Sequence, residues 1–433
     1  MFLCSRYILT MPEPSATFTP PTPHTPRGGS AAAAKRNAAS SASSRFRAER
    51  DATWVALGQA NSASKDGWEG GGTEQISTAL RPLVRRGRGA VSNETGRYEK
   101  QTRQIVDDGW DSLDELPRLR TEVTIERPRK IITRNASPDI SFDRSINPYR
   151  GCEHGCAYCF ARPTHAYMGL SPGLDFETRL FAKPDAAKLL EKELAAPGYE
   201  VRPIAIGTNT DPYQPVERQY RIMRDVLEVL SAANHPVGIV TKSALVLRDL
   251  DILAPMAGKG LVKVGLSVTS LDHKLSRLME PRASTPAKRL EAISGLSEAG
   301  IPVSIMTAPI VPAINDNEIE RLLEAGAAAG ATSAGYVLLR LPLEVAPIFK
   351  EWLKENFPDR AEHVLSLMRS MRGGKDYDSA WHERQRGRGP YAWQIGRRFE
   401  LAAKRLRLNE RRYDMRTDLF SPPVPVGGQL KLF

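Results

Sequence analysis

Cysteine is scarce in this sequence, with only four among 433 residues. Three of them, Cys152, Cys156 and Cys159, lie in one short segment, and Cys4 stands alone near the start. So few and so unevenly placed cysteines exclude the disulfide framework that holds small secreted proteins together. The pattern favours a reducing compartment, which we expect to be the cytoplasm, and three clustered thiols indicate a metal site.

Long apolar runs are also missing. None approaches the roughly 18 residues that a membrane-spanning helix needs, so we expect no membrane association. The apolar stretch within residues 1–10 is too short for a signal peptide. Residues 1–50 are rich in Ser, Ala, Pro and Arg and poor in acids. A transit peptide and an unstructured bacterial tail both fit this composition, and Met11 is an alternative start.

Large apolar residues are sparse over residues 1–80, which leaves little area to bury against the entropy of ordering. Near the other end, the Pro/Gly stretch SPPVPVGG (421–428) is expected to act as a linker. The sequence therefore divides into a disordered tail (1–80), a basic lead-in segment with a short strand at 121–126 (81–136), an α/β domain (137–345), a basic helical extension (346–416) and a flexible tail (417–433).

The middle of the chain alternates between short apolar runs and helical patterns. The runs end in small or polar residues, as buried parallel strands do, and helices are expected at 216–233 and 285–299. This alternation predicts a parallel α/β fold with right-handed crossovers. Six β/α units indicate a partial (β/α)6 TIM-like barrel rather than the closed barrel of eight. The six expected strands are 139–145, 202–210, 236–243, 262–270, 301–309 and 333–342.

Nearly every expected strand ends in a polar residue. Because the carboxyl ends of parallel strands meet at one edge of a sheet, such residues indicate a single shared site. The strand-end residues are Thr208, Asn209, Asp211, Lys242, Ser267, Thr269 and Arg340.

The clustered cysteines have the spacing C-x3-C-x2-C within GCEHGCAYCF (151–160). Gly151 and Gly155 allow a tight turn there and let backbone N–H groups approach sulfide. Thiolates are the usual ligands of iron–sulfur clusters, and three of them leave one iron of a four-iron cluster open to a small molecule. A zinc site completed by His154 or His165 is the alternative, although zinc sites usually pair cysteines as C-x2-C.

In this setting the motif resembles the signature of the radical SAM superfamily, with aromatic Tyr158 before the last cysteine, over roughly residues 135–345. The resemblance implies a 4Fe–4S cluster held by Cys152, Cys156 and Cys159, with S-adenosyl-L-methionine (SAM) on the open iron. An electron from the reduced cluster would cleave SAM to methionine and a 5′-deoxyadenosyl radical, which takes hydrogen from a substrate. A flavodoxin or a ferredoxin is the expected source of that electron.

Several segments resemble one branch of this superfamily, spore photoproduct lyase and its relatives described as DNA repair photolyases. That enzyme uses an additional cysteine near its cluster loop as a hydrogen donor, whereas the only cysteine left here is Cys4. The reaction is therefore expected to be lyase-like but unassigned, with Tyr167, Tyr213 or Tyr336 as alternative donors. The segments are GTNTDPYQPVE (207–217), TKS (241–243), GLSVTSLD (265–272), EPRASTPAKRLEAI (280–293) and APIVPAIND (308–316).

The resemblance implies, position by position, a set of SAM-binding residues. Asn209 and Asp211 would lie near the methionine amino group of SAM, and Arg282 would lie near its carboxylate. Ile310 and Val311 would pack on the adenine. The implied set is Tyr158, Asn209, Asp211, Lys242, Ser267, Arg282, Ile310 and Val311.

The net charge of +11 comes mainly from two flanking segments, 1–136 and 369–416. In the second segment arginine clusters alternate with aromatic residues such as Trp381 and Trp393, which suits binding to DNA or RNA. Part of it, 391–408, also has the pattern of an amphipathic helix, so packing of this helix on the barrel is the alternative. A different function is then a nucleic-acid-associated protein whose cluster is structural or redox-sensing.

The last five residues, QLKLF (429–433), resemble the peptide with which bacterial polymerases and repair proteins dock on the DNA sliding clamp. Leu432 and Phe433 can fill an apolar pocket, with Leu430 beside them, and Gln429 can hydrogen-bond at its rim. The alternative is that this tail adds an edge strand to the protein's own sheet or covers the mouth of the barrel.

Overall fold

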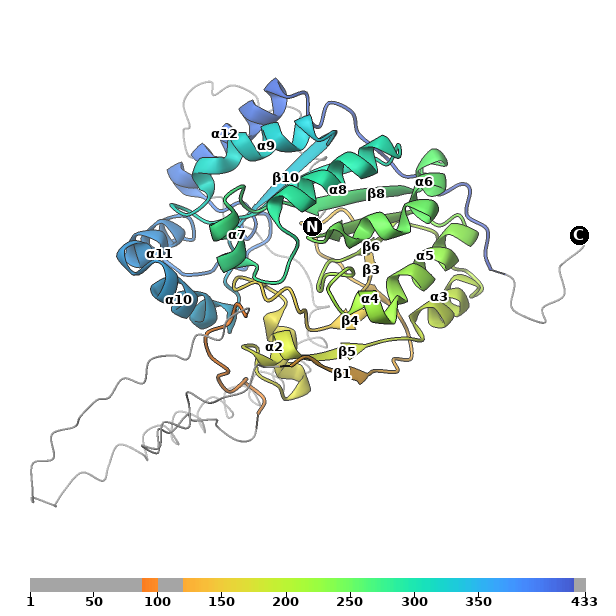
Figure 1. Cartoon of the computed structure of the whole chain (residues 1–433), viewed down its shortest axis with the longest axis horizontal. Coiled ribbons are helices and arrows are strands. Elements are labelled where there is room, and N and C mark those ends of the chain that lie inside the picture. The colour runs from red at the N-terminus through yellow and green to blue at the C-terminus, as the bar shows by residue number, and fades with distance from the viewer. Residues whose placement is uncertain (1–87, 100–119, 424–433) are drawn as a thin grey trace, which may run out of the picture. The chain divides into compact units, whose positions relative to one another are not determined.

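The computed structural model describes residues 88–99 and 120–423 (Figure 1). The tail at 1–80, Cys4 and the clamp-like peptide at 429–433 lie outside the described residues. None of the helices in the described ranges combines the length and the apolar character that a membrane span requires.

Seven strands form the main sheet, in the order β10-β9-β8-β7-β6-β3-β2. Six of them are parallel and neighbour one another in chain order, and β2 pairs antiparallel with β3 at one edge. The parallel strands are buried almost throughout, which explains their continuous apolar runs. Their bounds are β2 Ile132–Arg134, β3 Arg144–Ile146, β6 Ile204–Ile206, β7 Val237–Thr241, β8 Val262–Ser267, β9 Val303–Ile310 and β10 Ser333–Leu338.

Helices follow the strands and surround them in an arc (Figure 1). The helix expected at 285–299 begins at Pro286, and the Thr285 hydroxyl caps it by accepting from the backbone N–H of Lys288 at 3.4 Å. The helices within the sheet domain are α3 Ala186–Leu194, α4 Glu217–Tyr220, α5 Ile222–Ala232, α6 Leu250–Gly258, α7 His273–Met279, α8 Pro286–Glu298 and α9 Ile319–Ala328.

This architecture confirms a parallel α/β fold. Within the described residues the edge strands β10 and β2 have one partner each, so the sheet is open. The strands are shorter than expected, and the second one, β6, already ends at Ile206. Gly207 follows with φ of 86°, so residues 207–210 form a loop rather than the end of a strand. The antiparallel strand β2 was not expected.

A small second sheet carries the start of the cysteine segment. Its strands are β1 (Glu122–Ile125), β5 (Arg179–Ala182) and β4 (Tyr149–Arg150), with β5 in the middle. The strand β1 lies within the stretch 121–126, where a strand was expected. Because β4 ends directly before Gly151, its pairing with β5 fixes the point at which the cysteine segment leaves the sheet.

The basic extension forms α10 (Val345–Asn356), α11 (Ala361–Ser370) and α12 (Gly389–Arg405). The apolar face of α12 is buried, with Phe399 against Tyr336 of β10 at a ring-centroid distance of 4.7 Å. The helix therefore packs on the domain. Two tryptophans of the extension nevertheless face solvent, since Trp381 is 51% and Trp393 is 70% exposed.

A buried ion pair connects residues 151–160, which contain the three clustered cysteines, to a segment that lies earlier in the chain. Arg162 and Glu177 are both fully buried and lie 2.5 Å apart. Glu177 also accepts the backbone N–H groups of Gly89 (3.0 Å) and Ala90 (2.8 Å). Arg162 donates in addition to the carbonyl oxygen of Cys156 at 2.8 Å. One carboxylate thus holds both residues 89–90 and Arg162, and Arg162 in turn holds the segment 151–160.

We predict that Glu177→Ala lowers the free energy of unfolding by about 3–5 kcal/mol, because Arg162 would remain buried without a counter-charge. Urea unfolding followed by tryptophan fluorescence measures the loss. Glu291→Ala is the matched control, since its pair with Lys288 is exposed and is expected to contribute less than about 1 kcal/mol. Equal stability of the two variants would contradict the prediction.

Candidate functional site

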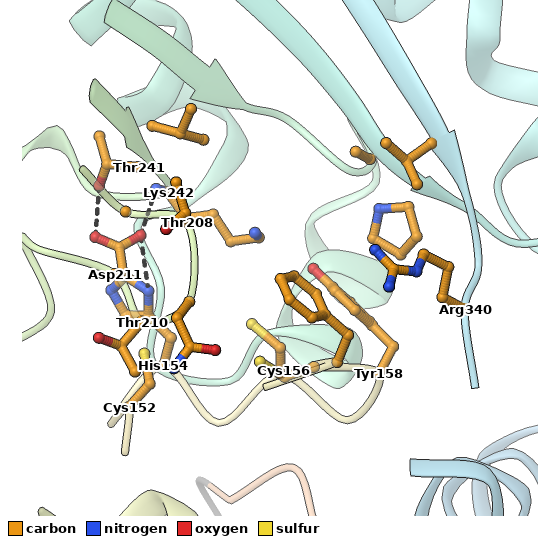
Figure 2. Close-up of a pocket in the computed structure, with 18 of the residues that line it drawn as sticks. Cys152, His154, Cys156, Tyr158, Thr208, Thr210, Asp211, Thr241, Lys242 and Arg340 are labelled. Atoms are coloured by element: carbon orange, nitrogen blue, oxygen red, sulfur yellow. Dashed lines mark hydrogen bonds and ion pairs between the residues drawn. The ribbon is translucent and has the colours of Figure 1, made fainter. Parts of the chain in front are cut away.

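A cavity opens where the parallel strands end (Figure 2). The open space within it, including solvent at its mouth, is about 740 Å³. Its walls come from residues 151–160, which we call the cysteine loop, and from the ends of β6, β7, β9 and β10. Of the residues expected in the site, Cys152, Cys156, Tyr158, Cys159, Thr208, Asn209, Asp211, Lys242 and Arg340 line this cavity.

The turn of the cysteine loop requires glycine at two positions. Gly151 and Gly155 have φ values of 73° and 65°, which side chains rarely adopt. A Cβ atom at Gly151 would also lie 2.8 Å from the carbonyl oxygen of Phe176. Both conformation and space therefore exclude a side chain at Gly151.

Hydrogen bonds from neighbouring segments hold the cysteine loop in place. The Gln214 side chain accepts from the backbone N–H of Glu153 (2.9 Å) and donates to the carbonyl oxygen of Gly151 (3.2 Å). On the other side, the backbone N–H of Ala157 donates to the carbonyl oxygen of Met279 (3.1 Å). These contacts hold the backbone of the cysteine loop on both sides.

The two histidines considered as zinc ligands are engaged elsewhere. His165 Nε2 lies 2.9 Å from the carbonyl oxygen of Arg179, and His154 Nδ1 lies 3.4 Å from Asp211 Oδ2. In the described part of the chain, no three His, Cys, Asp or Glu side chains converge closely enough to hold a single metal ion. In a four-iron cluster each cysteine binds a different iron, so its thiols need not converge. The donor set fits such a cluster better than a zinc ion.

Burial raises the pKa of the three thiols, and that of Cys156 reaches about 12. A thiolate in this position therefore requires a cationic partner. An iron–sulfur cluster provides one, because its irons bind thiolate directly.

Asp211 places a fixed negative charge in the cavity. Its carboxylate accepts from the Thr241 hydroxyl and from the backbone N–H of Lys242, each at 2.7 Å (Figure 2). Burial alone would raise the pKa of Asp211, but His154 and these hydrogen bonds outweigh it and lower the pKa to about 2. The group is ionised at any physiological pH and can hold a cation.

A second buried carboxylate, Glu280, organises the opposite wall. It accepts hydrogen bonds from the hydroxyls of Tyr158 and Thr269 and from the guanidinium of Arg289. Burial alone would raise the pKa of Glu280, but Arg289 and Lys242 lower it. The Lys242 ammonium lies 5.9 Å from the centroid of the Tyr158 ring. Tyr158 is therefore fixed with its ring toward the cavity and its hydroxyl in the interior.

Two polar residues implied by the resemblance lie outside the cavity lining. Ser267 at the end of β8 is fully buried, and its hydroxyl has no hydrogen-bond partner among the described residues. Arg282 forms an ion pair with Glu153 at 3.2 Å and lines a small polar pocket that shares His154 with the main cavity.

The apolar residues implied for the adenine also lie elsewhere. Ile310 and Val311 are buried in the core, at 2% and 0% exposure. The preceding residues Ala308 and Pro309 line the cavity instead. A ring that packs on this wall would therefore contact Ala308 and Pro309 and not the residues that follow them.

The alternative hydrogen donors do not line the cavity. Tyr167 is 67% exposed, Tyr213 lies beside the small polar pocket, and Tyr336 packs against α12. Among the described tyrosines, only Tyr158 is part of the cavity lining.

Sequence reasoning missed the residues that support the site from behind. They come from distant parts of the chain, as with Tyr158 and Glu280, which are 122 residues apart. Glu280 does open one of the segments that carry the resemblance, but its spacing does not indicate its partner. The missed residues are Arg162, Glu177, Gln214, Glu280 and Arg289.

Comparison with solved structures finds spore photoproduct lyase, with 17% identity and a TM-score of 0.49 over 66% of this chain and 79% of the other. A protein named radical SAM Nalpha-GlyT isomerase, from Pseudomonas phage M6, is 25% identical over 244 residues, which are 55% of this chain and 48% of the phage protein.

Two mycobacterial proteins have a higher sequence identity to this chain than the phage protein has. An uncharacterised protein of Mycobacterium bovis is 38% identical over 232 residues, which are 53% of this chain and 68% of that protein. An uncharacterised protein of Mycobacterium tuberculosis matches over the same lengths. The family model described as the radical SAM superfamily matches residues 146–326, which include the cysteine loop and the strands that end at the cavity. The chain belongs to the radical SAM superfamily.

Proposed function

We propose that this chain is an enzyme that binds a 4Fe–4S cluster and SAM in the cavity and takes hydrogen from a substrate. One observation carries the proposal: Cys152, Cys156 and Cys159 line the same cavity as the charged groups Asp211 and Lys242. SAM has an ammonium and a carboxylate on its methionine part, and these two charges match the two side chains. The thiols suit the cluster, as argued above.

The chemistry that the cluster and SAM supply when bound is one-electron cleavage of SAM to methionine, followed by removal of a hydrogen atom from the substrate. The chain contributes the binding site, its electrostatics and the exclusion of water. The electron comes from an external donor of the flavodoxin or ferredoxin type. The reaction that follows hydrogen removal is not specified by this site.

Different residues around the cavity bind different parts of SAM. Asp211 and Asn209 in the loop after β6 face the ammonium, and Asp211 keeps its charge because its pKa is lowered to about 2. Lys242 after β7 pairs with the carboxylate. The Tyr158 ring, fixed through its hydroxyl by Glu280, forms a wall for the adenine.

A nucleic-acid substrate is favoured by the surface of the basic extension. The exposed Trp381 carries the Arg384 guanidinium over its ring at 4.1 Å, and Trp393 projects from α12. Exposed aromatics beside arginines stack on bases and pair with phosphates. The alternative function, a nucleic-acid-associated protein with a structural or redox-sensing cluster, shares this surface but not the SAM chemistry.

SAM cleavage separates the two functions. We predict that the anaerobically reconstituted protein forms 5′-deoxyadenosine when SAM and dithionite are added, as measured by liquid chromatography. Lys242→Gln should reduce the rate at subsaturating SAM by at least about tenfold, because the carboxylate loses its counter-charge. A protein with a full cluster that never cleaves SAM would support the structural or redox-sensing function.

The ligand set can be tested with the cysteines themselves. We predict that Cys156→Ala loses most of its iron and sulfide, because two thiolates rarely hold a four-iron cluster. The matched control is Cys4→Ala, which should bind as much iron as the unaltered protein. Equal iron in Cys156→Ala, or loss of iron in Cys4→Ala, would show that the ligands are assigned wrongly.

Nucleic-acid binding makes a separate prediction. A single-stranded oligonucleotide should bind with an affinity that falls steeply with salt, and Trp393→Ala should weaken binding by at least about fivefold through lost stacking. Tyr167→Ala serves as control, since Tyr167 is as exposed but lies outside the extension. Fluorescence anisotropy measures both. Binding that ignores salt, or equal loss in the two variants, would argue against a nucleic-acid substrate.

A further inference from the structure

Arg340 lines the cavity but belongs neither to the cluster site nor to the proposed SAM site. It follows β10, whereas Asp211 and Lys242 follow β6 and β7, and β8 and β9 separate these strands in the sheet. Figure 2 shows Arg340 across the cavity from Asp211. Its guanidinium carbon lies 5.0 Å from the centroid of the Phe160 ring, another residue of the lining.

One polar atom of Arg340 has no hydrogen-bond partner among the described residues. Its Nε atom is buried and lacks a hydrogen-bond partner in the described ranges, and no carboxylate there forms an ion pair with it. A buried N–H without an acceptor is costly, so such groups normally meet a ligand or water. Stacking on Phe160 covers the face of the guanidinium and leaves its in-plane N–H groups free to donate.

The backbone that carries Arg340 is held firmly. The N–H of Leu338 donates to the carbonyl oxygen of Gln385 (2.8 Å), and that of Leu339 donates to the carbonyl oxygen of Ile310 (2.9 Å). The carbonyl oxygen of Leu339 in turn accepts from Arg372 at 3.0 Å. The backbone next to Arg340 is therefore held by three hydrogen bonds, which lowers the entropy cost of binding a ligand through its side chain.

A second arginine, Arg372, lies close to Arg340. Burial and the neighbouring Arg340 lower the pKa of Arg372, whose guanidinium donates to backbone carbonyls. Asp378 and Glu383, the acidic residues of the extension that lie near Arg372, form ion pairs with Arg388 at 4.0 and 3.7 Å. Among the described residues, no carboxylate lies within ion-pair distance of Arg340.

We propose that Arg340 binds an oxyanion, a phosphate or a carboxylate, of the molecule from which hydrogen is taken. This inference rests on the proposed function, because it assumes that SAM fills the side of the cavity at Asp211 and Lys242. The planar fork of the guanidinium matches two oxygens of either group. Arg340 thereby fixes which part of the substrate lies over the cysteine loop and makes the cavity selective for anionic substrates.

The test is calorimetric titration of the reconstituted protein, in the presence of SAM and without reductant, at constant ionic strength. Inorganic phosphate and acetate are separate arms, which distinguish the two sources of the oxyanion. We expect Arg340→Gln to weaken the binding of at least one probe about tenfold. Arg340→Lys, which keeps the charge but not the fork, should lie between this variant and the unaltered protein.

Arg386→Gln is the matched control, because Arg386 is exposed and does not line the cavity. Its probe affinity should stay within about twofold of the unaltered protein. Three results would overturn the proposal: neither probe binds, Arg386→Gln loses as much affinity as Arg340→Gln, or Arg340→Gln loses as much affinity for SAM as for the probe. Probe binding requires no cleavage of SAM, so failure here leaves the proposed function standing, and failure to cleave SAM leaves the probe result intact.

Discussion

The cysteine loop depends on a charge that is buried beneath it. Arg162 and Glu177 are removed from water together, and each compensates the charge of the other. Arg162 uses its remaining donors on the carbonyl oxygens of Cys156, Pro172 and Gly173. A loop with two left-handed glycines would otherwise have many conformations, so this pair converts a flexible sequence into a rigid frame for three thiols.

The cavity above the loop follows the same principle, with charges fixed by hydrogen bonds in a dry environment. Glu280 is buried and the Asp211 side chain is 9% exposed, and each is held ionised by donors from other elements. Lys242 stands between them, near the Tyr158 ring. Such groups need not reorganise when a ligand arrives, so binding energy is not lost in ordering them. Arg340 on the far wall differs from them, because it has no ion pair with a carboxylate among the described residues.

Much of the fold could be predicted from the sequence because it depends on local sequence patterns. Continuous apolar runs predicted the parallel strands, and polar residues at their ends predicted a shared cavity with Asp211 and Lys242 in it. The supporting layer was not accessible, because residues such as Gln214 and Glu280 act on partners that only the fold brings near. The strand expected at 202–210 was too long, because Gly207, with its positive φ, ends β6 and begins a loop. Of the residues carried over by position, Asn209, Asp211 and Lys242 line the cavity, whereas Ile310 and Val311 lie in the core.

The hydrogen bonds from Gly89 and Ala90 to Glu177 bear on where the functional unit begins. The match to the family model starts at residue 146, yet two donors to the central carboxylate come from well before it. Gly89 lies so close to the cysteine loop that a Cβ atom there would overlap the carbonyl oxygen of Gly155. Residues 89 and 90 thus pack directly against the cysteine loop. A chain trimmed to the family boundaries would lose both donors and expose that side of the loop to solvent. The shortest chain that keeps the cysteine loop in this conformation is therefore expected to include residues 89 and 90.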